Sequence, residues 1–214
     1  MTRETDKGKS MKLYSAPMPA PNPRRVRMFA AEKQIALEEV MLDLRQRDHK
    51  SADHLTRNSL GQVPVLETDE GVMIAETIAI CRYLDAIQPE PPMFGSTPVE
   101  IATVDMWVRR IEIQIGEPVK MFWRHAHPAT AALIEQHNAF GESNHGVLQR
   151  SMNWLDQEMV DGRTFLMGDK LSIVDVAAVT IIDFAKLIGM EPLTGHERVL
   201  AWHGRMAARP SYSA

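Results

Sequence analysis

The sequence predicts an α/β domain over residues 11–88, followed by an all-helical domain over residues 98–214. Three observations predict this division. Segments with strand-like alternation and segments of helical periodicity follow one another in the first part of the chain. Residues 89–97 open with Pro89-Glu90-Pro91-Pro92, which is typical of a stiff linker. Beyond this linker only helical spacing recurs.

The α/β domain is predicted to begin with a strand, a helix and a second strand. Residues 12–15 are short and β-compatible, and four prolines within residues 16–23 exclude a helix interior and a central strand. Apolar residues at helical spacing then predict a helix over about residues 24–35. Alternation over residues 39–44 predicts the second strand. Because the connection is a crossover, the two strands form a parallel pair.

The rest of this domain adds a weak helix, a hairpin and a last helix. The weak helical segment lies at residues 51–57. Residues 63–66 and 72–74 are apolar runs joined by a short turn, which indicates an antiparallel hairpin and makes the four-stranded sheet mixed. The last helix is predicted to begin near residue 78 and to end before Pro89. Its apolar face is formed by Ile80, Tyr83, Leu84 and Ile87.

The second domain begins with a helix whose apolar residues step by three and four. These residues are Ile101, Val104, Val108, Ile111 and Ile115. Pro118 must bend or end this helix. Further helices are predicted near residues 128–160, 172–188 and 196–208. Ser172 and Asp175 have the spacing of a capping box, and the mostly apolar segment after them is typical of a core helix.

Composition and charge exclude several classes of function. The 28 acidic residues outnumber the 24 basic ones and give a net charge of -4, the wrong sign for a non-specific nucleic-acid binder. No apolar run approaches the roughly 20 residues that cross a bilayer, and residues 1–10 are polar, unlike a signal peptide. We therefore expect a cytoplasmic protein with no nucleic-acid or membrane partner, in which residues 1–10 form a flexible extension.

The chain has one cysteine, Cys81. An internal disulfide, a CxxC redox pair and a thiolate zinc cluster are all excluded by this count. Cys81 itself lies on the predicted last helix of the first domain and is expected to be a buried apolar residue. Any thiol chemistry must use a thiol that a ligand brings.

Five motifs, in this order and in these structural settings, give the sequence a family resemblance. They are Pro21-Asn22-Pro23-Arg24-Arg25-Val26-Arg27, Gly61-Gln62-Val63-Pro64-Val65-Leu66, Ile74-Ala75-Glu76-Thr77, Phe122-Trp123-Arg124-His125-Ala126-His127-Pro128 and the box from Ser172 to Asp175. Over nearly its whole length the chain resembles soluble bacterial glutathione S-transferases, particularly an atypical branch that includes a yeast enzyme and lacks the usual catalytic Ser, Tyr or Cys. The resemblance implies a thioredoxin-like first domain that binds glutathione as co-substrate.

The resemblance assigns most of the glutathione contacts to two motifs. It implies a cis bond between Val63 and Pro64, so that the backbone of Val63 pairs with the cysteinyl unit of glutathione. On composition alone a trans bond would be expected there. Glu76 and Thr77 would hold the ammonium and the carboxylate of the γ-glutamyl group at a helix N-terminus. Without the resemblance, Thr77 would be a plain N-cap and Glu76 a solvated acid.

Donors for the glycyl carboxylate of glutathione are expected at His49 and Gln62, with Lys50 as a further candidate. These positions match those of the family's donors. The alternative is that Arg45, Arg47, His49 and Lys50 form a solvated basic face. For any single one of these residues, the sequence favours neither interpretation over the other.

The group that activates the thiol is not evident from the sequence. Lowering a cysteine-like pKa of about 8.5 by about two units takes about 2.7 kcal/mol of preferential thiolate stabilisation. At the position where many relatives carry Ser, Tyr or Cys, this chain has Ala20, and Tyr14 and Ser15 are expected to be structural. The resemblance to the yeast branch implies instead that the N-terminus of the first helix stabilises the thiolate. Backbone N–H groups from Asn22 to Arg25 and the Asn22 side chain would contribute.

An electrophile site is expected in the helical domain, after the bend at Pro118, where this domain would face the thiol. His125 and Arg124 are the candidates to polarise the acceptor or a bound water, and Met121 would line the apolar side. The alternative for His125 and His127 is a packed or capping role before Pro128. No metal is expected, because histidines two apart on a helix point to nearly opposite sides.

These inferences together predict a homodimeric glutathione S-transferase that conjugates glutathione to a small apolar electrophile in detoxification. Two alternatives remain open, and Ala20 is the feature that keeps the second one open. One is a glutathione-dependent isomerase, reductase or dehalogenase on the same fold. The other is a non-catalytic binding module that kept the scaffold and lost activity.

Overall fold

The computed structural model describes residues 11–17 and 19–214. The extension expected over residues 1–10 lies outside this part of the chain. The protein divides into two compact units, Met1–Pro89 and Glu90–Ala214. The first is α/β and the second is helical, as the sequence predicts.

The first unit is built on a mixed four-stranded sheet in the order β2-β1-β3-β4. Its strands are β1 (Lys12–Ser15), β2 (Glu38–Met41), β3 (Val65–Glu67) and β4 (Met73–Ala75). β1 and β2 are parallel, whereas β3 is antiparallel to both β1 and β4. The predicted crossover and hairpin are therefore both confirmed.

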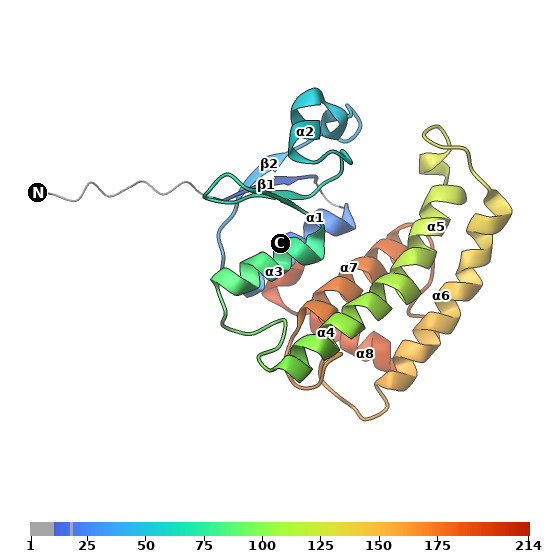
Figure 1. Ribbon diagram of the computed structural model, residues 1–214. Helices are drawn as coiled ribbons and strands as arrows, with labels where there is room; N and C mark the ends of the chain where they lie inside the picture. The colour runs from blue at the N-terminus through green and yellow to red at the C-terminus, as the bar shows by residue number, and fades with distance from the viewer. Residues whose placement is uncertain (1–10, 18) are drawn as a thin grey trace, which may run out of the picture. The chain divides into compact units, whose positions relative to one another are not determined.

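Helices cover both faces of this sheet (Figure 1). They are α1 (Pro21–Glu32), α2 (Ala52–Arg57) and α3 (Thr77–Ile87), with a short 3₁₀ turn, η1 (Asp48–Lys50), before α2. α1 and α3 lie together on one face and α2 lies on the other. The core between the sheet and the paired helices includes fully buried Leu13, Phe29, Leu66, Ile80 and Leu84.

The first helix begins earlier than predicted. The expected loop runs to Pro23, but α1 starts at Pro21. The first helical turn tolerates proline, because its N–H groups have no partner inside the helix and the fixed φ of proline suits the helical conformation. The helix also ends earlier, at Glu32 rather than near residue 35, because Gln34 turns the backbone to a φ of 56°.

The apolar face predicted for α3 is only partly correct. Ile80 and Leu84 are fully buried, but Tyr83 is half-buried and Ile87 is 47% exposed at the last position of the helix. The buried face is completed by Thr77 and Cys81. Both share the helical side of Ile80 and Leu84, since residues three and four apart lie on one face.

The second unit contains five α-helices among its described residues. They are α4 (Pro98–Arg110), α5 (Glu117–His125), α6 (Asn138–Glu158), α7 (Ile173–Leu187) and α8 (Glu197–Ala207). Short 3₁₀ turns, η3 (Pro128–Thr130) and η4 (Pro210–Ser213), follow α5 and α8. None of the helices among the described residues is both long enough and apolar enough to cross a bilayer.

The segment before Pro118 is a π-helix, η2 (Ile111–Gly116), which joins α4 to α5. The wider turn accommodates a residue that lacks an N–H and collides with a preceding carbonyl.

Two expectations for the helices of this unit are wrong. Ile101 is 38% exposed rather than part of the buried seam. The helix expected over residues 128–160 is a 3₁₀ turn, then a non-helical stretch, then α6, because Pro128 interrupts the preceding helix.

α7 is the core helix of this unit, as predicted, and every residue from Ile173 to Ile182 is buried. Its capping box is confirmed, because the Asp175 carboxylate accepts the backbone N–H of Ser172 at 3.0 Å. The same carboxylate also accepts the indole N–H of Trp202 at 2.9 Å. The box therefore caps the start of α7 and also joins it to α8.

Candidate functional site

The strand register brings four chain segments to one edge of the sheet. Ser15, the last residue of β1, pairs with Met41, the last residue of β2. The neighbouring Tyr14 pairs with Val65, where β3 begins, and Val65 pairs with Ala75, where β4 ends. The segments that follow β1, β2 and β4, and the segment that precedes β3, must therefore meet at this edge. All the residues predicted to bind glutathione in the first domain lie in these segments.

The start of α1 is poor in backbone donors. Ala20 is the N-cap and makes no side-chain capping bond, and Pro21 and Pro23 have no N–H. The N–H of Arg24 is bonded to the carbonyl of Ala20 at 3.3 Å. At positions 21–24 the turn thus offers a ligand only the backbone N–H and the exposed side-chain amide of Asn22. The structure therefore offers fewer donors at the start of α1 than the sequence predicts for Asn22 to Arg25.

Three buried arginines lie on the same helix, and one of them, Arg27, forms an ion pair with Glu39 at 3.5 Å. Arg24, Arg25 and Arg27 are each at most 9% exposed, and the first turn of α1 has no acid. Arg27 donates to the Ser15 hydroxyl at 2.9 Å and to the carbonyl of Ala16 at 3.1 Å. Such charges, together with the partial positive charge of a helix N-terminus, favour an anion at this edge.

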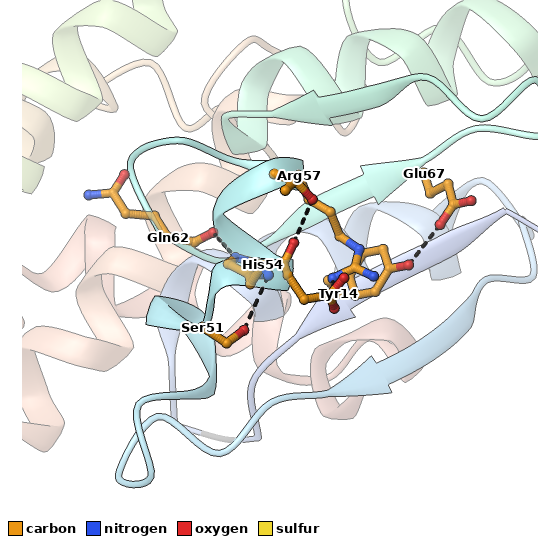
Figure 2. A network of polar contacts seen from close by, with 8 residues as sticks. Tyr14, Ser51, His54, Arg57, Gln62 and Glu67 are labelled. Carbon is orange, nitrogen blue, oxygen red and sulfur yellow. Dashed lines mark hydrogen bonds and ion pairs between the residues drawn. The ribbon is translucent and has the colours of Figure 1, made fainter.

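The two hydroxyls nearest the end of β1 have partners within the protein. Ser15 is fully buried and accepts the bond from Arg27. The Tyr14 hydroxyl donates to Glu67 at 2.7 Å, and the Arg57 guanidinium lies 4.4 Å from the centroid of the Tyr14 ring (Figure 2). Burial and the Glu67 carboxylate raise the pKa of Tyr14. Tyr14 thus joins β1 to β3 and Ser15 joins β1 to α1, in agreement with the structural role expected for them.

The loop before β3 has the predicted cis bond between Val63 and Pro64. Gly61 precedes it with a φ of +56°, and a Cβ there would lie 2.8 Å from the carbonyl oxygen of His49. Only glycine fits that approach of two backbones. Gln62, between them, has an exposed side chain and a carbonyl that accepts a bond from His54 at 3.0 Å.

His49 and Lys50 lie in η1, against this loop. The ammonium of Lys50 donates to the carbonyl of Leu60 at 2.9 Å, so Lys50 supports the loop. Burial, followed by the charge of Lys50, lowers the pKa of His49 below its usual value. His49 is therefore neutral at pH 7, where its imidazole supplies hydrogen bonds rather than a charge. Its Nδ1 is buried, and none of the described residues forms a hydrogen bond with it.

The start of α3 carries the second predicted pair. Glu76 is exposed and is the N-cap, with a φ of 67° that is unusual for a non-glycine residue. Thr77 is the first helical residue, so the plain N-cap role considered for Thr77 is wrong. Because no side chain caps this helix, its first N–H groups are available to an anion. The Thr77 hydroxyl oxygen accepts a buried 2.7 Å bond from Arg25.

Met121, Arg124 and His125 all lie on α5 in the second unit. Met121 is half-buried and Arg124 is exposed. The His125 ring packs against His137 and Phe140, at centroid distances of 5.6 and 5.5 Å. Its Nδ1 is buried without a hydrogen bond from any described residue.

His127 has the capping role that was the alternative for it. Its Nδ1 accepts the backbone N–H of Ala129 at 3.2 Å, at the start of the 3₁₀ turn that contains Pro128. In the described part of the chain, no three His, Cys, Asp or Glu side chains are grouped so that they could hold a metal ion.

Sequence comparisons identify both halves of the chain. The glutathione S-transferase N-terminal domain matches residues 9–86 and the C-terminal domain matches residues 107–210. The chain is also 32% identical over 205 residues to glutathione S-transferase 2 of Saccharomyces cerevisiae, covering 94% of this chain and 87% of the yeast protein. This protein belongs to the glutathione S-transferase family.

Solved structures of the family agree with this assignment. The structure of Gtt2 from S. cerevisiae superposes with a TM-score of 0.85 at 30% identity, covering 94% of this chain and 98% of the yeast chain. A glutathione S-transferase domain-containing protein from Marinobacter aquaeolei gives 0.86 at 31% identity, covering 94% and 99%. A Gtt2-class enzyme from Vibrio parahaemolyticus gives 0.81 at 29%, covering 95% and 96%. The protein is thus a glutathione S-transferase of thioredoxin-like fold that is similar to the yeast Gtt2 type.

Sequence reasoning did not single out three polar side chains at this edge. Arg25 lies within a quoted motif, but nothing in its spacing indicated the bond to Thr77. His54 and Asn58 lie in the weak helical segment and the turn after it, where no local pattern signals that both contact the carbonyl of Gln62. The Arg25 contact spans 52 residues and comes from the tertiary fold, whereas the contacts of His54 and Asn58 lie within one loop.

Proposed function

We propose that this protein binds glutathione along the sheet edge described above, stabilises its thiolate beside the start of α1, and conjugates it to a small apolar electrophile. The observation that carries the proposal is the convergence of the starts of two helices, α1 and α3, with the loop that contains Val63. Two anionic groups of one extended ligand can interact with the two helix ends while a strand-like backbone contact lies between them.

Each end of glutathione has partners of suitable chemistry. The γ-glutamyl carboxylate would take the first N–H groups of α3 and the Thr77 hydroxyl, and Glu76 would accept from the ammonium. His49 and Gln62 would donate to the glycyl carboxylate. Val63 would pair with the cysteinyl backbone in the manner of an added strand. Glutathione is consumed as a co-substrate in this proposal.

Thiolate stabilisation would come from α1. Ser15 and Tyr14 already bond to protein groups, and Ala20 has no side-chain donor. Asn22 would then supply the direct hydrogen bond, and the partial positive charge of the helix N-terminus would add to it. A hydrogen bond to a charged group is worth about 1.5–3 kcal/mol, and the field of a helix N-terminus up to about 2 kcal/mol in a partly buried site. Together they are comparable to the roughly 2.7 kcal/mol required.

Conjugation requires one new bond and one broken bond. The thiolate sulfur attacks the electrophilic carbon, a C–S bond forms, and the leaving group departs with its electron pair. His125 or Arg124 would polarise the acceptor, and Met121 would contact its apolar part. We expect the protein to act as a homodimer in the cytoplasm. Measuring its molar mass in solution tests the dimer.

The proposal is tested by binding and turnover together. Calorimetry measures the affinity for glutathione, and an activated aryl halide serves as a generic electrophile. Ultraviolet absorbance of the thiolate against pH gives the pKa of the bound thiol. We expect Asn22→Ala to raise that pKa and slow turnover by about tenfold, while Asn22→Ser, which keeps a donor, is affected less.

Three other results would each contradict the proposal. No binding at millimolar glutathione excludes a glutathione enzyme of any kind. Binding without turnover favours the non-catalytic module. Product formation in which glutathione is returned unchanged favours an isomerase, because conjugation consumes one glutathione for each product.

A further inference from the structure

The carbonyl of Gln62 accepts two hydrogen bonds from the α2 region. Nε2 of His54, on α2, lies 3.0 Å from the carbonyl oxygen. Nδ2 of Asn58, immediately after α2, lies 3.1 Å from the same atom. Figure 2 shows the contact between His54 and the main chain of Gln62, with the Gln62 side chain pointing away from it. Both lone pairs of this carbonyl are therefore used, and its direction is fixed.

A fixed carbonyl also fixes the next N–H. The peptide bond between Gln62 and Val63 is trans, since the cis bonds lie at Val63–Pro64 and Glu90–Pro91. In a planar trans peptide the C=O and the following N–H point in opposite directions. Because the Gln62 carbonyl points toward α2, the N–H of Val63 points away from α2. Among the residues that the structure describes, none accepts a hydrogen bond from it.

His54 cannot itself reach a ligand. Its side chain is only 1% exposed, and it packs edge-on against the ring of Tyr14 with 6.4 Å between centroids. A carbonyl oxygen only accepts, so Nε2 carries the hydrogen of this bond. Nδ1 is buried and makes no hydrogen bond to the described residues. Within the described part of the chain, this ring is therefore hydrogen-bonded only to Gln62.

Asn58 holds the same loop at three points. Besides the bond to Gln62, its Oδ1 accepts the N–H of Leu60 at 3.1 Å and its backbone carbonyl accepts the N–H of Gly61 at 2.7 Å. The turn from Asn58 to Gln62 is therefore held by short-range bonds before any ligand arrives. Such preorganisation lowers the entropic cost of ordering the loop when a ligand binds.

We infer that His54 and Asn58 are positioning residues for glutathione: by holding the Gln62 carbonyl against α2, they aim the Val63 N–H at the cysteinyl backbone of the ligand. This inference rests on the proposed function. Neither side chain touches glutathione, so their effect passes through the loop. It acts on the binding of glutathione rather than on the attack of the thiolate on its electrophile.

The test compares variants that differ in the donor to Gln62. His54→Phe keeps an aromatic ring of similar size but cannot donate, whereas His54→Gln places an amide donor at similar reach. Asn58→Asp keeps the acceptor for Leu60 and loses the donor. We expect His54→Phe and Asn58→Asp each to weaken glutathione binding in calorimetry by about tenfold, the worth of one lost hydrogen bond. His54→Gln should bind within about threefold of the wild type.

A matched control separates positioning from the integrity of α2. Ser51 caps α2 by accepting the backbone N–H of His54 at 3.2 Å, and its side chain is not one of the donors to the Gln62 carbonyl. Ser51→Ala should lower the melting temperature, because it removes a cap, while glutathione affinity stays within about twofold. The turnover number at saturating glutathione should change less than about twofold in all variants, with the loss confined to KM for glutathione.

The outcomes are distinct. If wild type does not bind glutathione, the proposed function fails and this inference fails with it. If wild type binds but His54→Phe binds equally well, only the inference is overturned. Ser51→Ala binding as weakly as His54→Phe would also overturn it, since helix stability would then explain both. Should His54→Phe not fold, Asn58→Asp decides by the same criterion.

Discussion

The guanidinium of Arg25 on α1 donates a 2.7 Å hydrogen bond to the hydroxyl oxygen of Thr77, the first residue of α3. Both residues are buried, at 4% and 7% exposure. Because a guanidinium can only donate, the Thr77 oxygen is the acceptor and its own hydrogen is directed elsewhere. The bond therefore leaves the hydroxyl ready to donate to an anion at the start of α3, and the cation behind it strengthens that donor.

This relationship predicts that the two residues act as a unit in glutathione binding. Thr77→Val removes the donor, and we expect the dissociation constant of glutathione to rise about tenfold. Arg25→Met leaves the hydroxyl free to rotate and removes the nearby charge, so a rise of similar size is expected. The double variant should bind no more than about threefold more weakly than either single one, because both changes disrupt the same interaction. Calorimetry on the four proteins gives the coupling directly.

Arg25→Lys is the control for folding, since it keeps a buried cation with a donor. It should retain more affinity than Arg25→Met, although a single ammonium lacks the planar fork of arginine. Full additivity of the Arg25→Met and Thr77→Val effects would show that the hydroxyl is not oriented by Arg25.

The order of elements in the first domain was predictable because local signals agree. Four prolines define the loop after β1, and apolar runs around residues 67–71 define the hairpin. The limits of α1 were not predictable in the same way. Proline is equally compatible with a loop and with the first turn of a helix, so Pro21 and Pro23 leave the start of the helix open. Pro118 likewise predicts that the preceding helix bends or ends, but not that the distortion is a π-helix.

The candidate site also contains residues that the sequence predicts and contacts that it does not. The motif residues Glu76, Thr77 and Val63 follow from family resemblance and from their place at element ends. The group that orients Thr77 comes from far along the chain, because Arg25 lies 52 residues before it. Such contacts depend on the sheet register and on the packing of α1 against α3, which a single sequence does not specify.

Gly141 and Gly146 lie in the same helix, α6, and we predict opposite effects of Ala at the two positions. A Cβ at Gly141 would lie 2.7 Å from both the Cβ and the backbone N of Ala126, so a backbone must move. Gly141→Ala should lower the free energy of unfolding by about 1–3 kcal/mol, despite the better helix propensity of alanine. Urea denaturation measures the change.

Gly146→Ala serves as the matched control. The nearest atom to a Cβ there is the flexible end of Arg150, at 3.6 Å. Because this Cβ collides with nothing, the better helix propensity of alanine remains. We expect Gly146→Ala to raise the free energy of unfolding by up to about 1 kcal/mol. If both variants were stabilised alike, the close packing of α6 on the end of α5 would be disproved.

Cys81 should be inert in the folded protein. Its side chain is fully buried in α3, and burial strongly raises the pKa of its thiol. The thiolate is the reactive form, so iodoacetamide should not modify the native protein at pH 7.5 and should add once per chain in denaturant, as read by mass spectrometry. Turnover with glutathione should survive this treatment. Rapid alkylation of the native chain would show that α3 opens, and Cys81→Ala identifies the site of the adduct.

Asp156 on α6 caps α8 from a distance, which predicts a pH-dependent stability. Its Oδ1 accepts the backbone N–H groups of Arg198 and Val199 at 2.8 and 3.1 Å, and its Oδ2 accepts the Arg198 guanidinium at 2.7 Å. The N-cap position of α8, His196, makes no such bond. Asp156→Ala should therefore lower the free energy of unfolding by about 2–4 kcal/mol at pH 7.

The pH dependence follows from the pKa of this carboxyl. Burial alone would raise it, but the hydrogen bonds from Val199 and Arg198 outweigh burial and hold the pKa of Asp156 below its usual 3.8. A pKa that is lower in the folded than in the unfolded chain stabilises the fold above about pH 4, and this contribution is lost as the pH falls through the folded value. In urea titrations, the stability difference between wild type and Asp156→Asn should be constant from pH 7 to 5 and should shrink below about pH 4. Because Asn keeps one acceptor for the helix N–H groups, a difference that persists unchanged at pH 3 would mean that the charge of Asp156 contributes nothing to the cap.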